Sequence, residues 1–267
     1  MKWLKIGVVI FVAIAITALG IDAADTLQGS RSTLLGQIVS TETKVCPEGM
    51  IEVTVAQSFT CVDEYEASVG KGCPYASPTN ELDSKANVDD VNCGALSKKD
   101  STPWRYITRE QAQTACLRSG KRLPKSSEWY LFSSGTPDAS TACNIDSNGI
   151  RTTGASEACK SAVGVFDTIG NVWEWTADDV IEGVYEGRVL PETGYVKQVD
   201  TYGMAVITDD ISSELFSKDY FWSSSEGAYG VIRGGFYGSK SDAGLYSVHA
   251  DTPPTSAGTA IGFRCVR

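Results

Sequence analysis

Eight cysteines constrain the fold of this 267-residue chain more than any other feature of its sequence. They are Cys46, Cys61, Cys73, Cys93, Cys116, Cys143, Cys159 and Cys265. No two of them have Cys-x-x-Cys spacing, and the single histidine, His249, is too few for a Cys/His zinc site. An even number of cysteines predicts disulfides in an exported chain, although the sequence alone does not determine their pairing. We therefore expect a loop-rich domain held together by disulfides.

Residues 1–24 have the pattern of a segment that directs export. Lys2 and Lys5 precede an apolar run from Ile6 to Ile21, and the small residues Ala23 and Ala24 follow it. The run is slightly shorter than a membrane-spanning helix requires, so we expect a signal peptide or, if it is retained, an N-terminal membrane anchor. Residues 25–44 are polar and lack cysteine, proline and aromatic residues, which indicates a spacer. The rest of the chain is then secreted or displayed at the cell surface, outside the cytoplasm.

The charge of the chain disfavours one class of partner. It has 23 basic and 33 acidic side chains, a formal net charge of −10. Nucleic acid is itself a polyanion, so we expect no nucleic-acid partner. Membrane contact is expected only through an N-terminal anchor.

Residues 45–267 are expected to form one α+β domain, because no second linker or internal repeat interrupts them. Thr108 and Gln111 have the spacing of a helix capping box, and Gly120 is placed to end that helix. A second, short helix with a serine cap is predicted before Gly135. The remaining sequence is typical of short, irregular antiparallel strands and turns. The sequence thus predicts two helices packed against such strands.

Five landmarks occur in order along this domain: CVDEYEAS, SGKRLPKSSEW, FDTIGNVWEWT, VIRGG and IGFRC. Together they resemble the domain of formylglycine-generating enzyme, or sulfatase-modifying factor, which has an elaborated C-type lectin fold. The resemblance implies a disulfide between the cysteine before KRLP and the cysteine after GFR, Cys116 and Cys265. Proximity in the sequence then suggests three further pairs: Cys46 with Cys61, Cys143 with Cys159, and Cys73 with Cys93.

The same resemblance implies a structural calcium site in the segment DTIGNVWE. Its ligands would be the side chains of Asp167 and Glu174 and the backbone carbonyls of Gly170 and Val172, which are the hard oxygen donors that calcium prefers. The alternative interpretation is a tight turn in which Glu174 is held by backbone donors and the neighbouring tryptophans fill the core.

The catalytic site of the resembled enzyme is not expected in this chain. That enzyme binds copper through two cysteines shortly after its RGG motif, and cuprous copper requires such soft thiolate ligands. The corresponding places fall near Ser239 and Gly244, and no cysteine occurs between Gly234 and Arg264. Related iron-dependent sulfur oxidases need a histidine-rich site, and a hydrolase triad through His249 would lack a G-x-S-x-G motif. We therefore expect no copper, no iron and no catalytic residues.

The C-terminal segment carries a second resemblance. From about Leu190, the motifs LPETGYV, DYFW, VIRGG and a terminal IGFRCVR are similar to the variable proteins of diversity-generating retroelements. In those proteins the last strands of the same fold form a ligand-binding face, whose variable positions derive from asparagine codons mutated at adenines. Such codons never yield Lys, Glu, Gln, Met or Trp, and none of these occurs from Ser241 to Val266. Short strands and glycine-rich turns also avoid long charged residues, so the missing residue types agree with diversification but do not require it.

The resemblance implies a variable region at about residues 233–267 and a set of ligand-binding positions within it. Tyr237 and Tyr246 occupy places of fixed aromatic residues that flank or floor the face. The positions expected to vary are Phe236, Gly238, Ser239, Asp242, His249, Asp251, Thr252, Ser256, Gly258, Thr259 and Ala260. Rings and short polar side chains of this kind suit adaptable recognition.

The sequence thus supports one main hypothesis: a non-catalytic binding protein with a diversified C-terminal surface. Its ligand would be a protein or glycan on another cell or virus surface. Two alternatives remain open: a structural or carbohydrate-binding relative without diversification, and an oxidase of the formylglycine-generating type.

Overall fold

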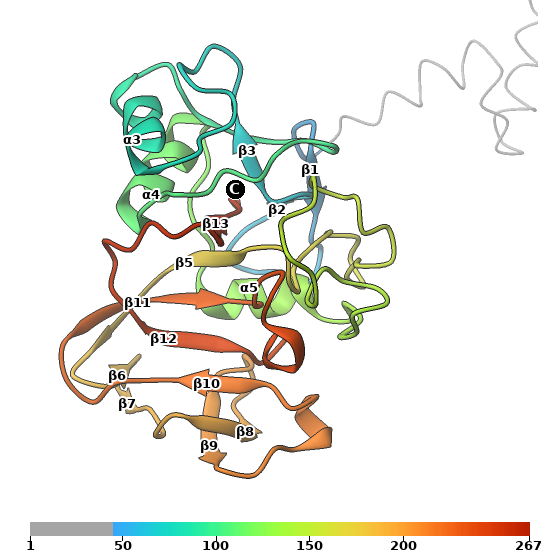
Figure 1. Ribbon diagram of the computed structural model, residues 1–267, viewed down its shortest axis with the longest axis vertical. Helices are drawn as coiled ribbons and strands as arrows, with labels where there is room; N and C mark the ends of the chain where they lie inside the picture. The colour runs from blue at the N-terminus through green and yellow to red at the C-terminus, as the bar shows by residue number, and fades with distance from the viewer. Residues whose placement is uncertain (1–44) are drawn as a thin grey trace, which may run out of the picture. The chain divides into compact units, whose positions relative to one another are not determined.

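The computed structural model describes residues 45–267, and its central element is a nine-stranded sheet (Figure 1). Neighbouring strands follow the order β7-β6-β5-β11-β12-β10-β8-β9, and β13 pairs with β5 beside this path. β13 runs parallel to β5, and β10 runs parallel to β12. The strands are β5 Trp173–Ile181, β6 Val184–Tyr185, β7 Arg188–Val189, β8 Gly194–Val199, β9 Ala205–Asp209, β10 Tyr220–Trp222, β11 Ala228–Arg233, β12 Val248–Thr252 and β13 Ile261–Phe263.

Two small antiparallel sheets precede the large one along the chain. The first pairs β1, Met50–Glu52, with β2, Cys61–Asp63, and the second pairs β3, Ala67–Val69, with β4, Ala95–Ser97. The helices among the described residues are α3 Glu81–Asp89, α4 Arg109–Arg118 and α5 Ser126–Ser133, with the short 3-10 helices η1 Glu214–Phe216 and η2 Lys240–Asp242. The expectation of two helices was therefore incomplete, and the domain contains more β-structure than that description implied.

The two expected helices are present, but their caps differ in how well they were predicted. The Thr108 hydroxyl accepts a hydrogen bond from the Gln111 N–H at 3.3 Å, and the Gln111 side chain accepts one from the Thr108 N–H at 3.0 Å. The predicted capping box of α4 is thus confirmed. The predicted serine cap of α5 is wrong, because Lys125 is the N-cap residue and its N–H donates to the carboxylate of Glu128 at 2.8 Å.

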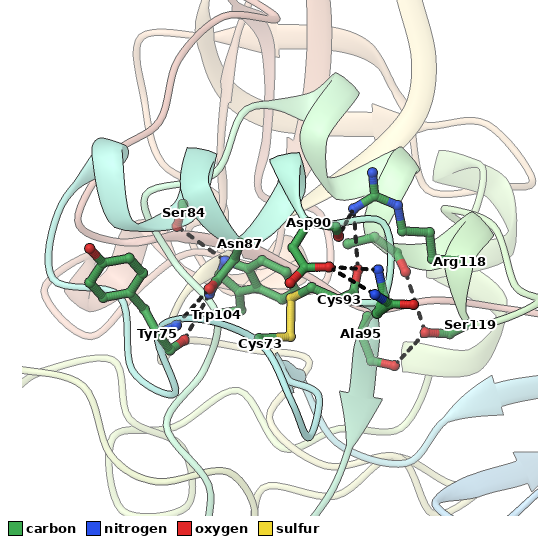
Figure 2. The surroundings of a disulfide bond; sticks show 12 residues. Cys73, Tyr75, Ser84, Asn87, Asp90, Cys93, Ala95, Trp104, Arg118 and Ser119 are labelled. Atoms are coloured by element: carbon green, nitrogen blue, oxygen red, sulfur yellow. Dashed lines mark hydrogen bonds between the residues drawn. A yellow bond between two sulfur atoms is a disulfide. The ribbon is translucent and has the colours of Figure 1, made fainter.

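The sequence pattern did not predict α3, because the positions that this helix buries are polar. Asn80 caps its N-terminus, and Ser84 and Asn87 are its buried residues. The Ser84 hydroxyl accepts a hydrogen bond from the indole N–H of Trp104 at 3.1 Å, and Asn87 bonds to both main-chain groups of Tyr75 at 2.8 Å (Figure 2). Hydrogen bonds rather than an apolar stripe hold the helix, so it lacks the periodicity by which helices are recognised.

Four disulfides join the pairs expected from the sequence. They are Cys46–Cys61, Cys73–Cys93, Cys116–Cys265 and Cys143–Cys159. Strands β3 and β4 are connected by a segment that contains α3. The Cys73–Cys93 bridge closes this segment into a loop (Figure 2). The Cys116–Cys265 bridge ties α4 to the chain end across a sequence separation of 149. Such bridges are typical of proteins in oxidising compartments.

The large sheet is covered differently on its two faces. On one face, Trp175, Ile232 and Phe263 pack in one hydrophobic cluster with the buried stripe of α4, Ala112, Ala115 and Cys116. On the other face, a second cluster contains Phe221, Val231 and Val248. Side chains alternate between the faces along each strand, so adjacent residues such as Val231 and Ile232 enter different clusters.

Most of the last residues of the chain lie in the core of the domain. Arg264, Cys265 and Val266 are all fully buried. The Arg264 guanidinium lies on the carboxylate of Glu174 in β5, with Nε 2.9 Å from Oε1 and 2.8 Å from Oε2. Val266 bridges to Val62 on one side and to Arg122 on the other. The C-terminus is therefore part of the core.

The predicted signal or anchor (1–24) and spacer (25–44) lie outside the described residues. Among residues 45–267, no helix is long and apolar enough to cross a membrane.

Replacing both Cys116 and Cys265 by alanine should destabilise the domain more than replacing both Cys46 and Cys61. These bridges span sequence separations of 149 and 15. Loop-closure entropy predicts stabilisation of about 3 kcal/mol for a loop of roughly 15 residues and about 4.7 kcal/mol for one of roughly 100. Urea unfolding followed by tryptophan fluorescence measures both losses. Equal losses would contradict this order.

Candidate functional site

The expected binding residues on strand β12 do not all lie on the same face of the large sheet. Val248 and Ala250 are fully buried in the cluster that contains Phe221, so His249 and Asp251 point to the opposite face. The side chains of His249 and Asp251 are 28% and 30% exposed, and His249 Nδ1 lies 3.0 Å from Asp251 Oδ1. Thr252 is buried, at 8% exposure, so it is a poor position for ligand contact.

His249 lies between two tryptophans from other strands. Its ring stacks on Trp222 of β10 with 3.9 Å between centroids and 9° between planes. The ring of Trp173, at the start of β5, meets it edge-on with 5.0 Å between centroids. The register of the parallel pair β10–β12 brings Trp222 opposite His249. His249, one of the positions expected to vary, thus packs against two rings outside the tail.

The rings continue beyond Trp222 as a row. Tyr220 lies next to Trp222 with 4.7 Å between ring centroids, and Tyr195 of β8 lies next to Tyr220 with 4.9 Å between centroids. Tyr195, Tyr220 and Trp222 are all half-buried. We call Trp173, His249, Trp222, Tyr220 and Tyr195 the aromatic row.

Sequence reasoning assigned no binding role to Trp173, Trp222, Tyr220 or Tyr195. One signal was available in the segment DYFW. In a strand, residues on both sides of a buried residue share a face, so a buried Phe221 places Tyr220 and Trp222 together. The proximity of His249 could not be inferred this way, because strand order is a tertiary property.

The loop after β11 is shaped by glycines and a serine. Gly235 has φ +87, and a Cβ on it would lie 2.4 Å from the Cβ of Ala243. The Ser239 hydroxyl accepts a hydrogen bond from the Phe236 N–H at 3.0 Å, and Ser239 is only 9% exposed. Ser239 is therefore better placed to hold the loop than to meet a ligand. Phe236 and Tyr237 are half-buried neighbours with 5.0 Å between their ring centroids, and Gly238 lies close to the Phe236 ring.

Main-chain carbonyls of the same loop bind fixed parts of the domain. The Tyr237 carbonyl accepts from the Ser147 N–H at 2.8 Å, and the Asp242 carbonyl accepts from the Ser247 hydroxyl. The Asp242 side chain is half-buried, and burial raises the pKa of its carboxyl group.

The segment before β13 is also held through its backbone. The Gly258 carbonyl accepts from the Tyr106 N–H at 3.2 Å, and the Thr259 carbonyl accepts from the Arg105 guanidinium at 2.7 Å. The Ala260 carbonyl accepts from the Trp173 N–H at 2.8 Å. Ser256 closes a turn by donating its N–H to the Pro253 carbonyl at 2.9 Å. These bonds do not depend on the side chains at positions 256–260.

Tyr246 lies apart from the aromatic row. Its ring packs edge-on against Phe216 with 5.2 Å between centroids and lies beside Tyr130 at 6.0 Å. It borders the cluster that contains Val248, on the other face of the sheet from His249. Its N–H donates to the carboxylate of Asp219 at 2.7 Å, and burial raises the pKa of its phenol to about 12. The expected ligand-binding positions therefore do not form one continuous face.

The expected calcium ligands do not form an open oxygen site. The Glu174 carboxylate faces the guanidinium of Arg264 and also accepts a hydrogen bond from the Trp129 indole at 2.8 Å. A cation at that carboxylate would lie against the positive charge of Arg264, so Glu174 does not fit the role of a calcium ligand. The Asp167 carboxylate accepts from the Gly154 N–H at 2.6 Å, and burial raises its pKa to about 6. In residues 45–267, no group of three or more Asp, Glu, His or Cys side chains is arranged to hold a metal ion.

The positions of the copper ligands in the resembled enzyme also lack metal-binding chemistry. Ser239 Oγ is engaged with the Phe236 N–H, and Gly244 lies against the Asp219 carboxylate, where a Cβ would be 1.9 Å from Oδ1. All eight cysteines of the chain are within the described residues and all are in disulfides. No thiolate is therefore available to bind copper.

Comparison with known proteins adds relatives of different kinds. The chain is 24% identical over 157 residues to hercynine oxygenase from Mycolicibacterium thermoresistibile, which covers 52% of this chain and 30% of that protein. Among solved structures, the Major Tropism Determinant I1 variant aligns with a TM-score of 0.47 and 17% identity, covering 83% of this chain and 53% of the other. CarF aligns with a TM-score of 0.39 and 14% identity, covering 78% and 85%. This chain thus spans about a third of the oxygenase and about half of the tropism determinant.

A match to a sequence family covers nearly all of the described domain. Residues 49–267 match the family described as the sulfatase-modifying factor enzyme 1-like domain. The match extends from β1 to the last residue of the chain and includes the buried C-terminal segment and the sheet that carries the aromatic row. This protein belongs to the sulfatase-modifying factor enzyme 1-like family.

Proposed function

We propose that this protein is a non-catalytic ligand-binding protein whose binding surface combines the C-terminal tail with the aromatic row. On this proposal, ligand contacts come from His249, Asp251, Phe236, Tyr237 and the side chains of the segment from Ser256 to Ala260. Trp222 and Trp173 form the support on which His249 rests. A support of rigid rings under adaptable polar groups is the chemistry of a recognition surface.

One observation carries the proposal: main-chain bonds hold the tail. The carbonyls of Tyr237, Gly258, Thr259 and Ala260 accept hydrogen bonds from residues outside the variable region. Every residue type has such a carbonyl, so these bonds survive side-chain replacement. A surface that tolerates exchange of its side chains is what diversification requires. Ser239 is the exception, because its hydroxyl takes part in holding the loop.

We propose that the protein is not an enzyme because its side chains cannot form the metal sites of the related oxidases. Copper-dependent oxidation requires thiolates, and every cysteine of the chain is committed to a disulfide. The hercynine oxygenase likeness covers only about a third of that protein, and this chain's single histidine cannot build a histidine-rich iron site. We therefore favour binding over oxidation.

The ligand on this proposal is a protein or glycan on another cell or virus surface, met by a secreted or surface-displayed protein. The four disulfides favour an extracytoplasmic location. A structural or carbohydrate-binding relative without diversification is the second candidate, because short residues in glycine-rich turns also explain the composition of the tail.

Diversification predicts a signature in the DNA around the gene. We expect a near-copy of the last hundred or so bases that differs only where the copy has adenine, close to a reverse transcriptase gene. Sequencing the flanking region tests this. If no such copy exists, the second candidate replaces the first.

The positions expected to vary, including the proposed contacts His249 and Asp251, should be replaceable at little cost in stability. Asp242→Ala and Asp251→Ala should each change the free energy of unfolding by less than about 0.5 kcal/mol, as surface substitutions do. His249→Ala should cost about 1 kcal/mol, because a stacked ring pair contributes roughly 0.5–1.5 kcal/mol. Buried Trp175→Ala is the control and should cost roughly 3–5 kcal/mol. Urea unfolding measures all four, and a loss above about 2 kcal/mol for Asp251→Ala would show that this position belongs to the core.

Calcium should not stabilise the domain, because Arg264 occupies the Glu174 carboxylate. We expect the melting temperature to agree within about 1 °C between calcium chloride and EDTA. An ion at about 100 times its Kd would instead add about 2.7 kcal/mol of stability, a rise of several degrees. Such a rise would restore Asp167, Gly170 and Val172 as calcium ligands.

A further inference from the structure

The aromatic row leaves the core at the point where helix α4 no longer covers the sheet. α4 packs over β5, and Trp173 and Trp175 of that strand are buried in the cluster that α4 closes. Strands β12, β10 and β8 follow β5 and β11 across the same sheet (Figure 1). The rings of His249, Trp222 and Tyr195 on these strands are half-buried. The half-buried part of the row therefore lies mostly on strands that precede the tail.

The row is a run of rings of which all but Trp173 are half-buried, and the His249 ring covers one face of Trp222. Its consecutive ring centroids are 3.9–5.0 Å apart, from Trp173 through His249, Trp222 and Tyr220 to Tyr195. Phe221, between Trp222 and Tyr220 in sequence, points into the opposite cluster, and this alternation holds both neighbours on the row. The geometry is thus set by strand register and does not depend on flexible loops.

A carboxylate stands at each end of the half-buried row. Asp251 is next to His249 and is 30% exposed. Asp209 of β9 is the direct cross-strand partner of Tyr195 and is exposed, so its side chain lies on the same face as the Tyr195 ring. Two basic residues are near the row in sequence: Lys197 of β8 is two positions from Tyr195, and Lys218, which pairs with Glu214 at 3.0 Å, is two positions from Tyr220. The two carboxylates favour positive charge at both ends of the row.

The domain as a whole is negatively charged, like the two carboxylates. Residues 45–267 have a formal net charge of −11, because four of the 23 basic and three of the 33 acidic side chains precede Val45. Such a domain attracts basic partners and repels acidic ones at long range.

We propose that the aromatic row binds an arginine-bearing basic segment of a partner protein, with guanidinium groups on the rings of Trp222 and Tyr220. This inference rests on the proposed binding function and names the chemistry of its ligand. Ring faces attract cations, and the planar guanidinium also stacks on them while donating hydrogen bonds to carboxylates. Asp251 and Asp209 are placed to receive those hydrogen bonds. A neutral glycan could use the rings and donate hydroxyl hydrogen bonds to the carboxylates, but it has no positive charge to pair with them.

The test uses the full chain and a defined probe, an acetylated and amidated peptide of four Gly-Arg repeats. Tryptophan fluorescence and calorimetric titration at physiological ionic strength measure its affinity. The same titrations are made with four Gly-Lys repeats, which carry equal charge, and with chitohexaose as a neutral glycan. We expect the arginine peptide to bind more tightly than the lysine peptide and the glycan to show no binding.

Substitutions in the aromatic row test whether the arginine peptide binds there. Trp222→Ala and Tyr220→Ala should each weaken arginine-peptide binding about 5-fold or more, the range of a cation–π contact. Trp222→Phe keeps a ring and should retain most of the affinity, which separates loss of the contact from loss of folding. Asp209→Asn should weaken binding by a few-fold. The matched controls Tyr75→Ala and Glu48→Gln alter an exposed ring and an exposed carboxylate elsewhere and should have no effect.

Three outcomes would overturn the inference. The first is an affinity that Trp222→Ala and Tyr220→Ala leave unchanged, which would indicate general electrostatic attraction. The second is equal affinity for the lysine and arginine peptides, and the third is row-dependent binding of the glycan instead. A flanking template copy found together with any of these results would support the proposed binding function while refuting arginine recognition.

Discussion

The buried ion pair between Arg264 and Glu174 is the interaction on which the rest of the domain depends. It joins the segment after the last strand to the central strand β5, and both side chains are almost completely buried. The remaining donors of Arg264 reach the carbonyls of Asp63 and Phe166, at 3.2 and 2.8 Å. Removing one partner of such a pair would leave an uncompensated charge in the core, at a cost of about 3–5 kcal/mol. Chain end and sheet centre are therefore bound to each other.

Arg233 plays the matching role at the other end of the tail. It is fully buried at the end of β11, and its guanidinium donates to the carbonyls of Gly203 and Leu245, at 2.9 and 3.1 Å. Burial lowers its pKa to about 10, which leaves the group charged at neutral pH. Two buried arginines thus frame the segment from Gly234 to Phe263. Between them, main-chain hydrogen bonds and the Ser239 hydroxyl hold the path of the chain.

On the proposed function, stability and ligand contact depend on different groups of this segment. A copper-dependent oxidase of the resembled kind would need thiolates between the two arginines, whereas no cysteine occurs between Gly234 and Phe263 in this chain. Neither arginine contributes to the exposed surface, so the frame does not depend on which side chains that surface carries. The aromatic row extends that surface onto β10 and β8, outside the frame, and ties its position to the sheet.

Helix prediction succeeded where the signal lies within a few residues of the sequence. It failed where the residues that the helix buries are polar. The capping box of Thr108 and Gln111 and the buried stripe of α4 act within a few residues, so the sequence predicts them. Helix α3 was missed because Ser84 and Asn87 are held by Trp104 and Tyr75, partners that only the fold brings near. The calcium hypothesis met the same limit: the charge that occupies Glu174 comes from Arg264, 90 residues away in sequence.

The sequence by itself determined the family, the number of disulfides and the absence of thiols from the tail, because each depends only on which residues occur and in what order. Tertiary structure alone decided which tail residues share a surface. His249 meets Trp222 through the parallel pairing of β12 with β10, and Asp251 lies beside His249. Thr252 turns inward, and Tyr246 packs on the other face of the sheet. Side-chain direction in a strand depends on which face the neighbouring layer covers, and no local pattern in the tail specifies that layer.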